Sequence, residues 1–185
     1  REPTTELLEQ ITTLVELEVS SNEIQKAVET LSKLGDGLVA GGLQEEYIRL
    51  GKMIIDNTKM RVSPWANEDA FDKVIGEVAK LEVEMGQLDD IRPQLMEYAA
   101  TIPRGTTRYI GLCEMFTYLA WFEEKFAEAI KWGEMGLDLK QKSGIDTRHD
   151  TRHNLALARR DSGLIDQALK DFSCGESVES ILKKD

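Results

Sequence analysis

The sequence predicts an all-α protein made of paired helices. Of its 185 residues, 41% are hydrophobic and only 4 are proline, and apolar side chains recur at helical spacing along most of the chain. One helical pattern also occurs twice, because Phe126 and Ala129 recur as Ile165 and Ala168 (165 minus 126 and 168 minus 129 both give 39). Self-similarity of this length, with two helices per unit, is typical of a helical repeat array.

The first elements are predicted from apolar spacing and from glycine. Residues 6–19 form an amphipathic helix that we expect to cap the array, and helices follow over residues 24–34 and 43–60. Residues 35–42 contain four glycines. This density predicts a loop, because a glycine inside a helix costs about 1 kcal/mol relative to alanine. The apolar side of the first helix is predicted to contain Leu7, Leu8, Ile11, Leu14 and Val15.

The later helices follow from caps and breakers. Asn67 is a predicted N-cap, and the next helix begins near Asp90, because Pro93 fits only the first turn of a helix. The predicted inward residues of the helix after Asn67 are Phe71, Val74, Ile75, Val78 and Leu81. The remaining predicted helices cover residues 106–122, 125–141, 147–161, 164–172 and, as a short final helix, 177–184.

We expect this chain to form one domain over residues 1–185, since its length suits a single medium-sized core. Residues 1–66 would contain the N-terminal helices and a degenerate repeat, residues 67–175 three repeat units, and residues 176–185 a C-terminal capping segment. The chain begins at Arg1 and not at Met, so we expect it to be a piece of a longer or processed protein.

The composition argues against several classes of partner. The formal net charge is −11, which disfavours nucleic acid and anionic lipid as partners of the whole molecule. No apolar run approaches the length of a membrane span, and the cysteines, Cys113 and Cys174, form no disulfide or zinc pattern. We therefore expect a reducing, cytoplasmic location, no membrane contact and no cofactor.

The last copy of the pattern carries a family resemblance. Asn154-Leu155-Ala156 leads to a turn at Gly163, and Ala168 and Phe172 follow at the spacing A-x-x-x-F. These residues resemble a tetratricopeptide repeat, in particular the longer variety found in kinesin light chains. The resemblance implies antiparallel helix pairs stacked as a right-handed α-solenoid, in which the first helix of each pair lines a concave groove that holds a peptide or a partner protein.

Alignment on that copy predicts which side chains face the groove. An aromatic side chain beside an arginine is a typical peptide anchor, and Asn154 occupies a position resembling the asparagine with which some of these grooves clamp a C-terminal carboxylate. We expect a noncatalytic protein–protein interaction module that binds a peptide or partner protein, with an acidic segment as a candidate ligand. The predicted partner-binding residues are Lys73, Lys80, Tyr118, Trp121, His153, Asn154 and Arg160.

Residues 146–153 read Asp-Thr-Arg-His twice and leave other hypotheses open. On a helix, His149 and His153 would share a face with the spacing of a zinc H-E-x-x-H motif, although Asp150 replaces the glutamate. A metal-dependent hydrolase is therefore the alternative function.

The arginines of residues 147–160 support a further hypothesis. This stretch contains four arginines and one aspartate, and guanidinium groups suit carboxylates and phosphates. A plain solvent-exposed helix face explains the same residues, and so does a structural or oligomerisation segment of a longer protein. The oligomeric state is left open.

Overall fold

The computed structural model describes residues 4–58, 68–87, 91–144 and 151–173, and these residues contain helices and no strand. The predicted all-α class is confirmed. The predicted cap at Asn67, the predicted helix 177–184 and His149 lie outside the described residues. The chain folds as two compact units, Arg1–Thr101 (unit 1) and Ile102–Asp185 (unit 2). The single array and its right-handed solenoid stay predictions, and each unit is described by itself.

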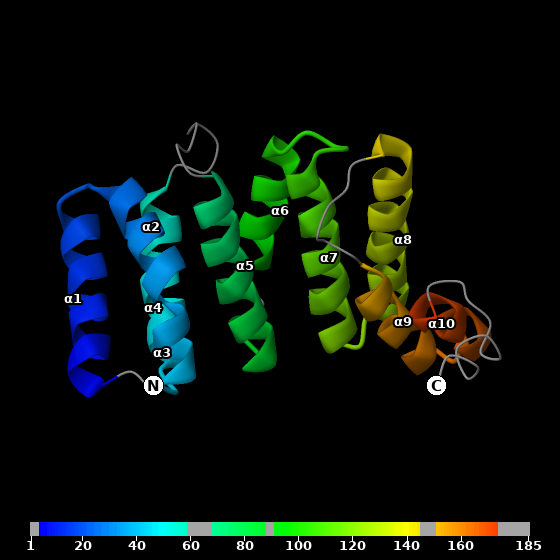
Figure 1. The fold of residues 1–185 in the computed structure, drawn as a ribbon, viewed down its shortest axis with the longest axis horizontal. Coiled ribbons are helices and arrows are strands. Elements are labelled where there is room, and N and C mark those ends of the chain that lie inside the picture. The colour runs from blue at the N-terminus through cyan, green and yellow to red at the C-terminus, as the bar shows by residue number, and fades with distance from the viewer. Residues whose placement is uncertain (1–3, 59–67, 88–90, 145–150, 174–185) are drawn as a thin grey trace. The chain divides into compact units, whose positions relative to one another are not determined.

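Unit 1 is built from α1 to α6 (Figure 1). Helix α1 packs against α2 and α4, and α5 packs against the same two helices. Tyr98 of α6 joins α5, because its ring lies 5.1 Å from that of Phe71 and its hydroxyl donates a hydrogen bond to Asp72. The predicted inward residues of α5, from Phe71 to Leu81, are all buried. The helices of unit 1 are α1 (Thr5–Ser20), α2 (Ile24–Leu34), α3 (Asp36–Ala40), α4 (Gln44–Asn57), α5 (Glu68–Glu84) and α6 (Arg92–Thr101).

The loop prediction for residues 35–42 is wrong, because α3 (Asp36–Ala40) lies within this range. Leu38 of α3 is fully buried. The flanking glycines serve close packing: a Cβ on Gly35 would overlap the Tyr47 ring, and a Cβ on Gly41 would lie 2.8 Å from Leu8 Cδ1. Tertiary packing here outweighs the intrinsic cost of glycine near a helix.

The predicted apolar side of α1 is wrong in two positions. Leu8, Ile11 and Val15 are buried, but Leu7 and Leu14 are exposed. Three-four spacing allows either of two adjacent stripes to face the core, and burial follows the one that meets α2 and α4.

The described part of unit 2 contains α7 to α10. Helix α7 packs against α8, α9 packs against α7 and α8, and α10 packs against α9. Leu155 of α9 lies close enough to Gly133 of α8 that a Cβ there would come within 2.9 Å of it. Helix α9 begins at Arg152 with Thr151 as its N-cap, and residues 147–150 of the predicted helix lie outside the described residues. The helices of unit 2 are α7 (Thr107–Phe122), α8 (Phe126–Ser143), α9 (Arg152–Asp161) and α10 (Ile165–Phe172).

One turn conformation ends each of the odd-numbered helices α1 to α9. A backbone N–H donates to the carbonyl five residues earlier, at 2.7–2.8 Å in every case, which is the hydrogen bond of a Schellman motif. The residue before the donor is left-handed in all five turns: Asn22 (φ 60°), Gly42 (φ 80°), Gly86 (φ 72°), Glu124 (φ 61°) and Gly163 (φ 86°). The last three are 38 and 39 residues apart. The interval seen in the sequence therefore recurs in the backbone conformation.

Replacement of Glu124 by glycine should stabilise the protein. A side chain at positive φ is strained by about 1 kcal/mol or more, and Gly163 fills the same position without that strain. We expect Glu124→Gly to raise the free energy of unfolding by about 1 kcal/mol in urea denaturation, and Gly163→Ala to lower it by a similar amount. Ala127→Gly, inside α8, is the control and should be destabilising. A loss of stability in Glu124→Gly would contradict the strain.

Candidate partner-binding surface

Three aromatic side chains gather on one side of α7. Tyr118, Trp121 and Phe122 are three and four residues apart, a spacing that places them on the same helix face. Their ring centroids lie 6.0 Å apart for Tyr118 and Trp121, 5.9 Å for Tyr118 and Phe122, and 6.2 Å for Trp121 and Phe122. Tyr118 and Trp121 are half-buried, and Phe122 remains 42% exposed. These three side chains, called the aromatic cluster below, therefore form an apolar surface that is partly exposed to solvent.

The end of α9 adds a charged pair to the aromatic cluster. Trp121 Nε1 donates a hydrogen bond of 2.8 Å to Asp161 Oδ2. Arg160 donates to the same carboxylate through Nε (2.6 Å to Oδ1) and Nη2 (3.0 Å to Oδ2). The hydrogen bonds from Arg160 and then from Trp121 hold the pKa of Asp161 below its usual 3.8. Asp161 is therefore ionised near neutral pH and fixes both neighbours.

His153 and Asn154 lie at the opposite end of α9. They belong to its first turn, whereas Arg160 belongs to its last, and six residues of helix separate them by about 9 Å along the axis. The His153 ring packs edge-on against Phe172 of α10, with centroids 5.8 Å apart. The structure therefore brings Tyr118, Trp121 and Arg160 together and leaves these two residues outside that group.

The two predicted lysines lie in unit 1 and make local contacts there. Lys73 Nζ lies 2.9 Å from Asp36 Oδ2 and donates to the Ser32 carbonyl at 2.8 Å. Lys80 Nζ lies 3.8 Å from Glu77 Oε1. Lys73 thus ties α5 to the end of α2 and to α3. Their membership of one groove with the aromatic cluster stays a prediction.

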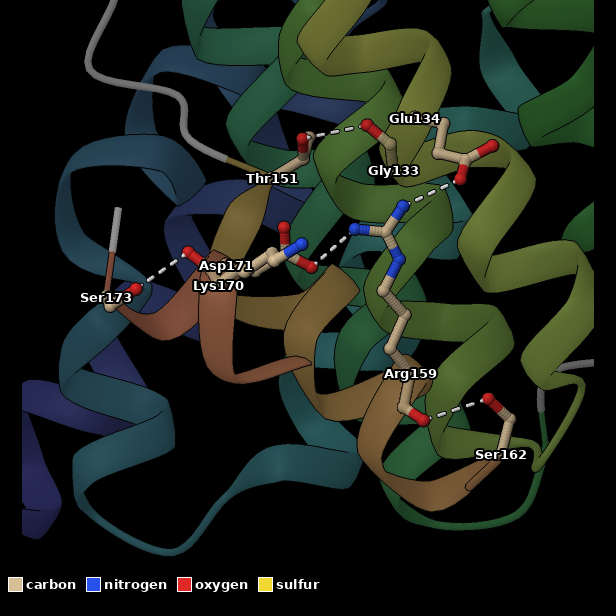
Figure 2. A network of polar contacts seen from close by, with 8 residues as sticks. All are labelled: Gly133, Glu134, Thr151, Arg159, Ser162, Lys170, Asp171 and Ser173. Atoms are coloured by element: carbon tan, nitrogen blue, oxygen red, sulfur yellow. Dashed lines mark hydrogen bonds and ion pairs between the residues drawn. The ribbon is translucent and has the colours of Figure 1, made fainter. Parts of the chain in front are cut away.

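Arg159 has a structural role, which weakens the hypothesis of an anion site on residues 147–160. Its Nη1 donates to Asp171 Oδ2 at 2.6 Å and its Nη2 to Glu134 Oε1 at 2.7 Å (Figure 2). Only 14% of the Arg159 side chain is exposed. Burial acts to lower the pKa of Arg159, but the hydrogen bonds with Asp171 and Glu134 outweigh it and the pKa is raised. This guanidinium links α8, α9 and α10 and is not available to a ligand.

A second contact in Figure 2 fixes the start of α9. The hydroxyl of Thr151, which is buried, donates to the Gly133 carbonyl at 3.1 Å. Thr151 and Arg159 therefore attach both ends of α9 to α8. These contacts fix the position of α9, and so they place Asp161 within hydrogen-bonding distance of Trp121 on α7.

Other candidate chemistry is limited within the part of the chain that the structure describes. No group of three His, Cys, Asp or Glu side chains is placed there to hold a metal ion, and His149 of the alternative hydrolase lies outside that part. Burial raises the pKa of the Cys113 thiol to about 11, although Arg104 lowers it somewhat. The thiol therefore stays protonated and poorly nucleophilic at neutral pH. None of the described helices combines the length and the apolar character that a membrane crossing requires.

Comparison with protein-family models, curated proteins and solved structures found no match. The sequence places Phe122 in the same aromatic cluster as Tyr118 and Trp121, but neither Phe122 nor Asp161 was among the predicted partner-binding residues. Their positions differ by 39 (161 minus 122), the offset between the two copies of the helical pattern, so the repeat register could have placed them at equivalent positions of two neighbouring helices.

Replacing Arg159 by alanine should lower the stability of the protein more than replacing its neighbour Arg160. Arg159→Ala leaves Asp171, whose side chain is 13% exposed, without this charged partner, so we expect the free energy of unfolding to fall by about 1–3 kcal/mol. Arg160→Ala removes an exposed contact and should change it by less than about 0.5 kcal/mol. Urea denaturation measures both. Equal losses would contradict the structural role of Arg159.

The indole N–H of Trp121 should report the ionisation of Asp161. The folded-state pKa of Asp161 is lowered, so the contact contributes to stability above the ordinary pKa and is lost as pH falls through the folded value. We expect the indole resonance to shift in NMR titrations with a midpoint below 3.8. The midpoint should rise in Arg160→Ala, and the shift should vanish in Asp161→Asn. The same shift in Asp161→Asn would assign it to another group.

Proposed function

We propose that this protein is a noncatalytic protein-binding module, and that the aromatic cluster of Tyr118, Trp121 and Phe122, together with Arg160, anchors a peptide segment of the partner. The observation that carries the proposal is the packing of three partly exposed aromatic rings beside an arginine held by Asp161. Tryptophan, tyrosine and arginine are the residue types that contribute most to binding at protein interfaces.

The geometry of the cluster favours binding because its members are already ordered. Trp121 is fixed by its hydrogen bond to Asp161, and Arg160 by two hydrogen bonds to the same carboxylate. Because these side chains are already fixed, the protein loses little further conformational entropy when a partner binds. The surface is therefore suited to a short segment that inserts an apolar or aromatic side chain.

The charged groups of the cluster are poorly suited to proton transfer. A general acid or base works best with a pKa near the operating pH. The pKa of Asp161 is lowered by Arg160 and that of Arg160 is raised by Asp161. Both pKa values are therefore shifted further from neutral pH, in opposite directions. This pairing supports recognition as the role of the surface.

The charge of unit 2 allows a partner that combines an apolar anchor with an acidic residue. Unit 1 contains 20 acidic and 10 basic residues, a net charge of −10, whereas unit 2 contains 14 and 13, a net charge of −1. An acidic segment is repelled by unit 1 and tolerated by unit 2. Its carboxylate would share or replace Asp161 on Arg160. The extension of this site along a concave groove through Lys73, Lys80, His153 and Asn154 rests on the predicted repeat stack.

Peptide selection tests the proposal. A phage-displayed library of random peptides is selected on the full chain, and the enriched peptides are synthesised and titrated calorimetrically. We expect enrichment of an aromatic residue near Asp or Glu, and Trp121→Ala to weaken binding at least about tenfold, which corresponds to about 1.4 kcal/mol. Arg160→Ala should weaken the acidic peptides more than their amidated versions.

Phe172→Ala is the matched control, because Phe172 is also an exposed aromatic residue of unit 2, at 44%, but lies on α10 against His153. Peptides that bind Trp121→Ala as tightly as the original protein would remove the aromatic cluster from the site. Loss of binding in Phe172→Ala alone would move the site to α10.

A further inference from the structure

Helix α1 exposes a stripe of leucine side chains. Leu7, Leu14 and Leu17 are 47%, 43% and 59% exposed. Leu14 follows Leu7 by two turns and Leu17 follows by almost one more, so the three side chains lie along one side of the helix. The adjacent side, which contains Leu8, Ile11, Val15 and Val19, is buried. The leucine stripe (Leu7, Leu14 and Leu17) is thus an apolar surface that the core of unit 1 does not use.

The charged side chains of helix α1 itself are all acidic. Helix α1 contains four glutamates and no lysine or arginine. Two of them are occupied: Glu16 lies 2.6 Å from Arg49 Nη2, and Glu18 accepts a hydrogen bond from Thr30. Glu6 and Glu9 have no cationic partner among the described residues. An apolar stripe bordered by unneutralised carboxylates therefore lies on the unit that carries a net charge of −10.

We propose that the leucine stripe is a docking surface for a basic amphipathic helix of a partner protein. Ten residues of helix separate Leu7 from Leu17, about 15 Å, so an incoming helix needs about three turns with apolar residues at positions i, i+3, i+4 and i+7. Lysine or arginine at the borders of that stripe would meet Glu6 and Glu9. This surface lies in unit 1 and takes a partner of opposite charge to the one proposed for the aromatic cluster.

Charge argues against the other occupants. A second copy of the chain docked through the same stripe would bring four glutamates of α1 against four, and like charges across an interface oppose binding. An anionic lipid surface is repelled for the same reason. A cationic helix is the occupant that gains from both the leucines and the carboxylates.

The test uses a synthetic helix as the probe. A 14-residue peptide of leucine and lysine, with leucine at helical spacing, is titrated into the full chain at about 0.15 M salt. A peptide of the same composition with alternating leucine and lysine is the control for nonspecific attraction. We expect saturable 1:1 binding of the helical peptide and at least tenfold weaker binding of the control peptide.

Variants then locate the site. Leu14→Ser with Leu17→Ser should weaken binding of the helical peptide at least tenfold, whereas Leu34→Ser, on α2 and 45% exposed, should leave it unchanged. Glu6→Gln with Glu9→Gln should weaken binding and reduce its salt dependence more than Glu29→Gln, because Glu29 is already paired with Lys33.

Three results would overturn the proposal. One is the absence of saturable binding, and another is an equal loss in Leu34→Ser and in the double leucine variant. The third is a dimer in light scattering that the double leucine variant converts to monomer, because a second copy would then occupy the stripe. Circular dichroism checks that each variant folds. None of these variants touches Trp121 or Arg160, so failure here leaves the proposal for the aromatic cluster standing.

Discussion

The paired helices of this protein depend on one backbone constraint. Where α1, α3, α5, α7 and α9 end, a six-residue turn closes with one N–H to carbonyl hydrogen bond and requires a left-handed residue just before the donor. This turn reverses the chain within a few residues, so consecutive helices can bury their apolar sides against each other. Glycine fills the left-handed position at Gly42, Gly86 and Gly163, whereas Asn22 and Glu124 fill it at some conformational cost.

The charge of the chain is distributed unevenly between the two units. Nearly all of the net charge of −11 belongs to unit 1, because unit 2 is close to neutral. The net charge of the whole chain does not reveal this difference between the two units. The exposed leucines of α1 lie in an acidic setting, whereas the aromatic cluster of α7 has an arginine beside it. Apolar contact could anchor a partner at either surface, but long-range electrostatics would attract a basic partner to unit 1 and would have little influence at unit 2.

Apolar spacing predicted most of the helices because it depends on the chain alone. It was insufficient where a residue's role depends on a neighbour distant in sequence. Burial of Leu38 turns a glycine-rich segment into α3, and contact with α2 and α4 decides that Leu8, not Leu7, faces the core. Arg159 and Arg160 are adjacent and chemically equal, yet carboxylates at Glu134 and Asp171 make the first a structural residue. No local pattern contains that information.

The same contact that orders the aromatic cluster also restricts its partners. Asp161 holds Trp121 and Arg160 in place, so the surface is formed before a partner arrives. An acidic ligand must compete with a carboxylate that is already bound and whose pKa is lowered by that contact. Charge alone therefore gives little net gain on Arg160, because one ion pair is exchanged for another in water. In the proposed complex, affinity would come from the apolar contact with Tyr118, Trp121 and Phe122, and the acidic residue would contribute mainly to orientation.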